Sequence, residues 1–217
     1  MAQTNPTENN PIGEFESRVP DSMHPALETA YKYRKSIALG VGAILVCTLA
    51  YVGWGAYSSR AEDKAQAALG DILLEKTGQD RITALEGLLA SAPDSVKPAL
   101  LLELAEASMT AEAFDKAAGY WDSLAGETDD DLKIVARMGR AKCLVLAGKP
   151  ADAVTILTDL QGTVGEEYTV PVNRQLAVAA EAAGDKAQAL AAYKVLAEKQ
   201  VADKPFVDFK IAQLEAQ

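Results

Sequence analysis

Hydrophobic and polar positions follow a helical period along residues 58–217. Apolar residues recur three and four positions apart within short segments, and Pro or Gly separates most of these segments. The pattern predicts helices at 62–77, 80–91, 96–109, 113–124, 132–147, 151–160, 172–183, 186–199 and 205–215. The alternating β-branched runs that are typical of strands are missing from this part of the sequence. We therefore expect an all-α fold.

A repeated phrase indicates how these helices are organised. LAGKPADAVTIL begins at Leu146 and AAGDKAQALAAY begins at Ala182, 36 residues later. At this period, alanines recur in both helices and large apolar residues follow them. The alanines are Ala105, Ala141 and Ala177 in the first helices and Ala117, Ala153 and Ala189 in the second; the large residues are Trp121, Leu157, Tyr193, Leu124, Leu160 and Leu196. Small residues let two helices pack closely, so the period predicts stacked helical hairpins, grouped as 62–91, 96–124, 132–160 and 172–199 with a capping helix at 205–215.

The ends of several helices are also marked in the sequence. Gly148 and Gly184 stand between the two helices of their hairpins, where a residue with positive φ is least costly. Glu112 occupies the same slot one period earlier. Thr128, followed by three aspartates, predicts the N-cap of the helix at 132–147.

The run from Ser36 to Tyr57 has a different pattern, because its 22 residues include no charged side chain. A helix of this length crosses the roughly 30 Å hydrocarbon layer of a bilayer. The run therefore predicts a single transmembrane helix. Lys32, Arg34 and Lys35 precede it, and this basic bias favours an N-terminus in the cytoplasm and an extracytoplasmic domain at 58–217. Cleavage near the small residues at the end of the run stays open as an alternative.

The residues before the predicted span have the composition of a disordered segment. Residues 1–25 contain four prolines, many polar side chains and few apolar ones, so they cannot bury enough surface to become ordered. We expect residues 1–35 to form a disordered cytoplasmic tail, which leaves three parts: the tail, the span at 36–57 and the helical domain at 58–217.

The charge distribution and the residue types restrict the chemistry of the helical domain. Five of the 31 acids and five of the 21 bases lie in residues 1–60, which leaves 26 acids and 16 bases in residues 61–217. This acidic excess argues against binding to nucleic acid or to anionic lipid surfaces. The only histidine is His24, in the predicted tail, so a Ser/His/Asp or Cys/His catalytic site cannot be built in the domain. Zinc spacings and phosphate-binding glycine motifs are missing too, and we expect no enzyme activity, no cofactor and no metal.

Binding is the function that this composition leaves. A stack of helical hairpins presents a concave surface that holds other polypeptides, and its first helices line that surface. The polar residues that we expect there are Arg137, Arg140, Asn173, Arg174 and Gln175. The alternative, that these five are ordinary exposed residues, stays open. Cys143 lies in a helical pattern without a partner cysteine nearby, and we interpret it as a small buried apolar residue.

The positions of the small residues, the glycine and the aromatic residue resemble the tetratricopeptide repeat (TPR). The similarity is best over residues 134–199 and partial over residues 98–125, where Glu112 replaces the glycine. Arg137 and Asn173 stand where that pattern has a large apolar residue, and the period is longer than usual. The resemblance implies a TPR-like α-solenoid.

A wider resemblance begins in the predicted span. The segments GVGAILVCTLAYVGWGAYSSRAEDKAQAAL, LLLELAEASMTAEAFDKAAGYWDSLAGETDDDLKIVARMGRAKCLVLAGKPADAVTIL and GDKAQALAAY are similar to the YfgM family of bacterial inner-membrane proteins. The resemblance implies one span, a periplasmic TPR-like domain, and work as an ancillary subunit of the Sec translocon. The implied partners are a SecYEG-like channel, a PpiD-like chaperone and secreted polypeptides. Two alternatives stay open: a scaffold for another envelope assembly complex, and a structural protein that forms homodimers.

Overall fold

The computed structural model describes residues 34–199 and 201–216. The chain divides into two units, Met1–Tyr57 and Ser58–Gln217. The predictions for most of the tail, including the position of His24, lie outside the described residues.

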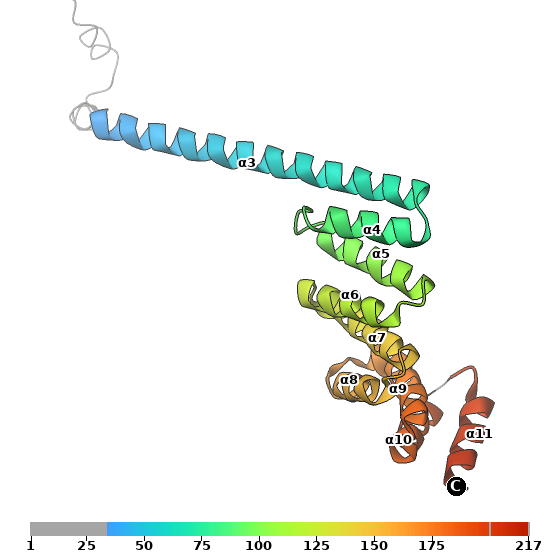
Figure 1. The fold of residues 1–217 in the computed structure, drawn as a ribbon. Coiled ribbons are helices and arrows are strands. Elements are labelled where there is room, and N and C mark those ends of the chain that lie inside the picture. Colours follow the sequence, from blue (N-terminus) through green and yellow to red (C-terminus); the bar gives the residue numbers. More distant parts are fainter. Residues whose placement is uncertain (1–33, 200, 217) are drawn as a thin grey trace, which may run out of the picture. The chain divides into compact units, whose positions relative to one another are not determined.

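Helices make up nearly all of the described chain, and residues 34–199 and 201–216 contain no strand, which confirms the all-α class (Figure 1). The first helix, α3, spans Arg34–Glu75. The others are α4 (Gly78–Leu89), α5 (Lys97–Thr110), α6 (Phe114–Glu127), α7 (Asp130–Leu146), α8 (Pro150–Thr163), η2 (Glu166–Tyr168, a short 3₁₀ helix), α9 (Thr169–Ala183), α10 (Lys186–Ala197) and α11 (Lys204–Glu215). Each helix predicted from residue 80 onward has a counterpart with slightly different ends, and η2 was not predicted.

The helix α3 differs most from its prediction. The sequence pattern separates a span at 36–57 from a helix at 62–77, whereas α3 runs through both segments without interruption. The connecting residues 58–61 are Ser, Ser, Arg and Ala, and none of them breaks a helix as Pro does. Among the residues that the structure describes, no helix combines the length and the apolar character needed to cross a membrane.

Within Ser58–Gln217, helices α5 to α10 form three successive hairpins, α5/α6, α7/α8 and α9/α10, each packed against its neighbours (Figure 1). All six alanines of the repeat are fully buried, as predicted. The large residues Trp121, Leu157 and Tyr193 are buried in one core that extends from α5 to α11. A second core joins the end of α3 to α4 and α5 through Ala65, Ile82 and neighbouring leucines. Repetition of the small and large positions therefore explains the stacking.

The three hairpin turns share one hydrogen-bond pattern. The N–H groups of Gly148 and Lys149 donate to carbonyl groups three and five residues earlier, and Gly184 and Asp185 do the same. This pair of bonds is the Schellman motif, which requires a left-handed residue after the helix. The φ angles of Gly148 and Gly184 are 76° and 74°, which confirms the prediction. Glu112 adopts φ 58° and makes the same two-bond turn with Ala113, although it carries a side chain.

The predicted role of Thr128 is wrong. Thr128 ends α6 instead of capping α7, and its hydroxyl group donates to the Leu124 carbonyl oxygen at 2.7 Å. Helix α7 begins two residues later, with Asp129 at its N-cap position. The hydroxyl group follows the preceding helix because a carbonyl group four residues earlier is within reach of a threonine at a helix end.

Candidate partner-binding site

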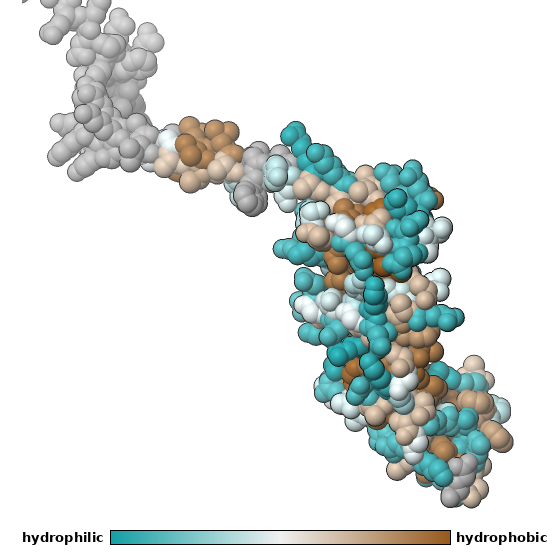
Figure 2. All heavy atoms as spheres, in the orientation of Figure 1, coloured by the Kyte–Doolittle hydropathy of each residue, from teal (hydrophilic) through white to brown (hydrophobic). Residues whose placement is uncertain are grey.

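A pocket of about 350 Å³ opens between the first helices of two consecutive hairpins, α7 and α9. It is lined mainly by aliphatic side chains, with polar groups at a few positions. The lining residues are Ala141, Lys142, Val145, Leu146, Leu157, Arg174, Gln175 and Val178. Leu146 and Val178 keep 48% and 52% of their surface exposed, so the apolar lining continues to the surface. Figure 2 shows hydrophobic residues between largely hydrophilic ones on the visible face of this unit.

Two cationic side chains line this pocket, and they differ in their surroundings. Arg174 forms an ion pair with Asp203, which precedes α11, and its Nη2 donates to Asp203 Oδ1 at 2.8 Å. The hydrogen bonds from Arg174 hold the pKa of Asp203 below its usual value. Lys142 is exposed, and none of the ion pairs found among the described residues includes it. The positive charge of Lys142 therefore lies at the pocket without an ion-pair partner in the part of the chain that the structure describes.

Gln175 also lines this pocket, but its amide oxygen is not exposed there. The Oε1 atom is buried and has no hydrogen-bond partner among the residues that the structure describes. A buried carbonyl oxygen without a donor costs about 1–3 kcal/mol, so this position is a weak point of the packing. Of the five residues predicted to contact a partner, Arg174 and Gln175 are the two that the structure brings together in the pocket.

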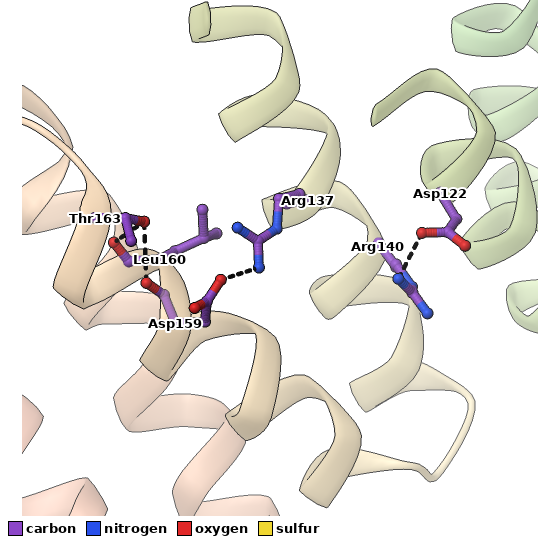
Figure 3. A network of polar contacts seen from close by, with 6 residues as sticks. All are labelled: Asp122, Arg137, Arg140, Asp159, Leu160 and Thr163. Carbon is purple, nitrogen blue, oxygen red and sulfur yellow. Dashed lines mark hydrogen bonds and ion pairs between the residues drawn. The ribbon is translucent and has the colours of Figure 1, made fainter. Parts of the chain in front are cut away.

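Arg137 and Arg140 lie on α7 outside the pocket, and their guanidinium groups are engaged by acids of neighbouring helices. Arg137 Nη2 lies 2.5 Å from Asp159 Oδ2 on α8, and Arg140 Nη1 lies 2.5 Å from Asp122 Oδ1 on α6. In Figure 3 the two side chains point toward opposite neighbours of α7. These ion pairs connect three successive helices across the boundary between two hairpins.

Asn173 is buried, with 1% of its surface exposed. It stands where a TPR has a large apolar residue, and two hydrogen bonds compensate for its burial. Gln161 Nε2 donates to Asn173 Oδ1, and Asn173 Nδ2 donates to the Thr169 carbonyl oxygen at 2.8 Å. A buried amide with both groups paired is stable in a core, so the structure places Asn173 away from the surface on which a partner would lie.

Lys142, Leu146 and Val178 were missed by the sequence analysis, although a signal was present. Glu106, Lys142 and Val178 are spaced by 36 residues and therefore occupy equivalent slots on the first helices. Glu106 lines a different pocket, between α4 and α5, and Val178 shares the pocket of Lys142. Applying the period to exposed positions, and not only to core positions, would have identified this surface.

The cysteine of the helical unit offers little reactivity. Cys143 is fully buried, and burial raises the pKa of its thiol, so the reactive thiolate is disfavoured. This environment fits the predicted role as a small buried residue. Within residues 34–199 and 201–216, no cluster of three or more His, Cys, Asp or Glu side chains could hold a metal ion.

Stacked hairpins with an alanine at each helix crossing, Schellman turns between the helices and a pocket on the first helices define an α-solenoid of the kind that holds other polypeptides. The model of the tetratricopeptide repeat-like domain matches residues 31–216. The chain belongs to this family. No curated protein matches the chain, and no solved structure matches it.

Proposed function

We propose that this protein is a membrane-anchored scaffold that binds polypeptides in the pocket between α7 and α9, and that it has no catalytic activity. The observation that carries this proposal is the pocket itself, which combines an exposed aliphatic lining with Lys142, a cation that has no ion-pair partner among the described residues. A chain segment supplies the two groups that such a surface binds, an apolar side chain and an opposite charge. Membership in the TPR-like family supports a scaffold that holds other proteins.

The proposed anchor is the segment from Ser36 to Tyr57. It has no charged residue, and the structure forms it as part of one helix, α3. Its described large apolar side chains are exposed, among them Ile44, Leu49 and Tyr51, and Figure 2 shows a hydrophobic cluster along this part of α3. Several positions of the segment lie outside the residues whose side chains are described. The basic residues before it support an N-terminus in the cytoplasm of a bacterium and a periplasmic solenoid.

We further propose that the scaffold works beside the Sec translocon and recruits a periplasmic chaperone or isomerase, or secreted chains, to it. The similarity of three segments to the YfgM family supports this role, together with the anchor and the solenoid that follow one another along the chain. Anchoring confines the scaffold and its partners to a thin layer at the membrane, which raises their effective concentration without strong intrinsic affinity.

Affinity purification of the full chain in mild detergent tests this role. We expect Sec channel subunits and a periplasmic isomerase to co-purify with the wild-type chain and to be reduced with Val178→Asp, which places a charge in the exposed part of the pocket. Thr155→Asp on α8 is the matched control, because Thr155 is exposed and does not line the pocket. Enrichment of a different envelope complex without the Sec channel would reject the translocon role. Recovery of a second copy of the chain, with no other protein, would favour the homodimer.

A further inference from the structure

The charge around the α7/α9 pocket is opposite to that of the domain in which it lies. Residues 61–217 carry 26 acids and 16 bases, yet the lining residues of this pocket include Lys142 and Arg174 and no carboxylate. The pocket beside α5 shows the reverse case, because Glu103 and Glu106 line it together with Arg81. The basic character is therefore local to the α7/α9 pocket.

Of the two cations at the pocket, Lys142 is the one available to pair with a ligand carboxylate. The guanidinium group of Arg174 is already matched by Asp203, and replacing that bidentate pair would cost as much as it gains. Lys142 has no such compensation in the described chain. A carboxylate placed beside the aliphatic lining would pair with Lys142 without breaking an internal contact.

We propose that the occupant of this pocket is a polypeptide segment that inserts one aliphatic side chain and carries an acidic residue next to it, with the carboxylate paired to Lys142. This inference rests on the proposed function and names the class of segment that the scaffold selects. Ala141, Val145 and Leu157 form the apolar surface for the inserted side chain.

Two ligand classes have similar chemistry here, because a fatty acid also combines an aliphatic chain with a carboxylate. Membership in the tetratricopeptide repeat-like family favours a polypeptide, since stacked helical hairpins hold other polypeptides. A fatty acid is therefore an outcome of the test.

The test measures binding of fluorescein-labelled, end-blocked peptides to the full chain in mild detergent by fluorescence anisotropy. Three peptides share a central Leu and differ only in its two neighbours, which are both Asp, both Asn or both Lys. A fourth peptide has the Asp neighbours but a central Ser instead of Leu. We expect the Asp-flanked Leu peptide to bind about threefold to tenfold more tightly than the Lys-flanked one, because one partly exposed ion pair is exchanged for a repulsion. The Ser peptide should bind more weakly than its Leu counterpart.

Two variants test whether Lys142 causes the preference for Asp-flanked peptides. Lys142→Glu should reverse the order of the Asp-flanked and Lys-flanked peptides. Lys133→Glu is the matched control, because Lys133 is exposed on the same helix outside the pocket, and it should leave the order unchanged. An unchanged order in Lys142→Glu, equal binding of the Leu and Ser peptides, or binding of none of the peptides would overturn the inference. Saturable binding of decanoate with no binding of any peptide would also overturn it.

The inference can fail while the proposed function stands. If the Sec channel and the isomerase still co-purify with Lys142→Glu at wild-type levels, while peptide selection does not depend on Lys142, the scaffold role survives and the charge selection is wrong. If neither partner co-purifies with the wild-type chain, the proposed function fails, whatever the peptides show.

Discussion

At the scale of single residues, the turn positions between the helices show how one backbone geometry is met by different side chains. Gly148, Gly184 and Glu112 occupy the same slot of the repeat and all adopt positive φ. Glycine does so without cost, whereas a residue with a Cβ atom pays roughly 1–2 kcal/mol for this conformation. Glu112 therefore marks a strained point in the α5/α6 turn.

Replacing Glu112 by glycine should stabilise the helical unit by about 0.5–1 kcal/mol. The relief of strain outweighs the greater freedom that glycine gives to the unfolded chain. Urea unfolding followed by circular dichroism measures the change. Gly184→Ala is the control at the equivalent turn and should destabilise by about 1 kcal/mol or more. A loss of stability in Glu112→Gly would show that the side chain of Glu112 contributes more than its backbone costs.

Gly139 is required for a different reason, a close approach between two helices. A Cβ atom built at Gly139 would lie 2.5 Å from Trp121 Cδ2 and would clash with the ring of this buried tryptophan. Gly139→Ala should therefore destabilise the unit by about 1–3 kcal/mol, as overpacking of a core does. Gly119→Ala is the matched control, because a Cβ atom there meets no other atom within 4 Å. Thermal unfolding that ranks Gly139→Ala at or above the wild type would contradict this packing.

At the scale of helices, tyrosines and ion pairs connect elements that are not consecutive. Tyr120 on α6 donates to Glu86 Oε1 on α4 at 2.6 Å. Lys149 at the start of α8 forms an ion pair with Asp115 on α6, and Lys210 on α11 forms one with Glu181 on α9. These contacts link helices of successive hairpins in addition to the packing of the apolar core, and where the groups are exposed each is worth at most about 1 kcal/mol.

The tyrosine contacts make stability dependent on alkaline pH. Burial, reinforced by the nearby carboxylates of Glu86 and Glu181, raises the pKa of Tyr120 and of Tyr193 to about 12. Because the folded pKa lies above the ordinary tyrosine value of 10.0, the protonated phenols stabilise the fold fully below pH 10, and this contribution is lost as the pH rises through 12. Unfolding midpoints measured from pH 8 to 12 should fall less steeply in Tyr120→Phe than in the wild type. Identical slopes would show that Tyr120 does not titrate with the fold.

Most of the fold could be predicted from the sequence because its determinants are local and repeated. Alanines such as Ala141 and glycines such as Gly148 mark the crossings and turns directly, and the period links one hairpin to the next. The pocket could be predicted only in part. Arg174 and Gln175 were identified from their place on a first helix, but the ion-pair partners of Arg137 and Arg140 depend on how α7 is rotated against α8 and α6. That rotation is set by side chains far apart in the sequence, and no short pattern encodes it.

At the scale of the whole chain, the proposal combines one segment in the lipid bilayer with another in water. In this proposal the uncharged segment from Ser36 to Tyr57 is the part in the bilayer, and Ser58–Gln217, which carries the acidic excess, is the part in water. A scaffold of this kind works only if both segments belong to one continuous chain in the membrane fraction.

Alkaline carbonate extraction of membranes tests the anchor. The full chain should remain in the membrane pellet, because a helix inserted in the bilayer is not released by removal of surface charge interactions. A variant in which residues 36–57 are replaced by the cleavable export signal of another protein should appear in the soluble fraction. Release of the full chain by carbonate would contradict insertion and would leave only peripheral attachment.

The most direct test of the central claim, that the face between α7 and α9 holds a polypeptide, is photo-crosslinking in living cells. A photoreactive amino acid is placed at Lys142 or Val178 in the pocket, and at Thr155 on α8 or Ala191 on α10 as exposed controls on second helices. The account predicts protein adducts from the two pocket positions, with Sec channel, isomerase or secreted chains identified by mass spectrometry, and few adducts from the controls. Equal adducts from all four positions, or none from the pocket, would contradict it.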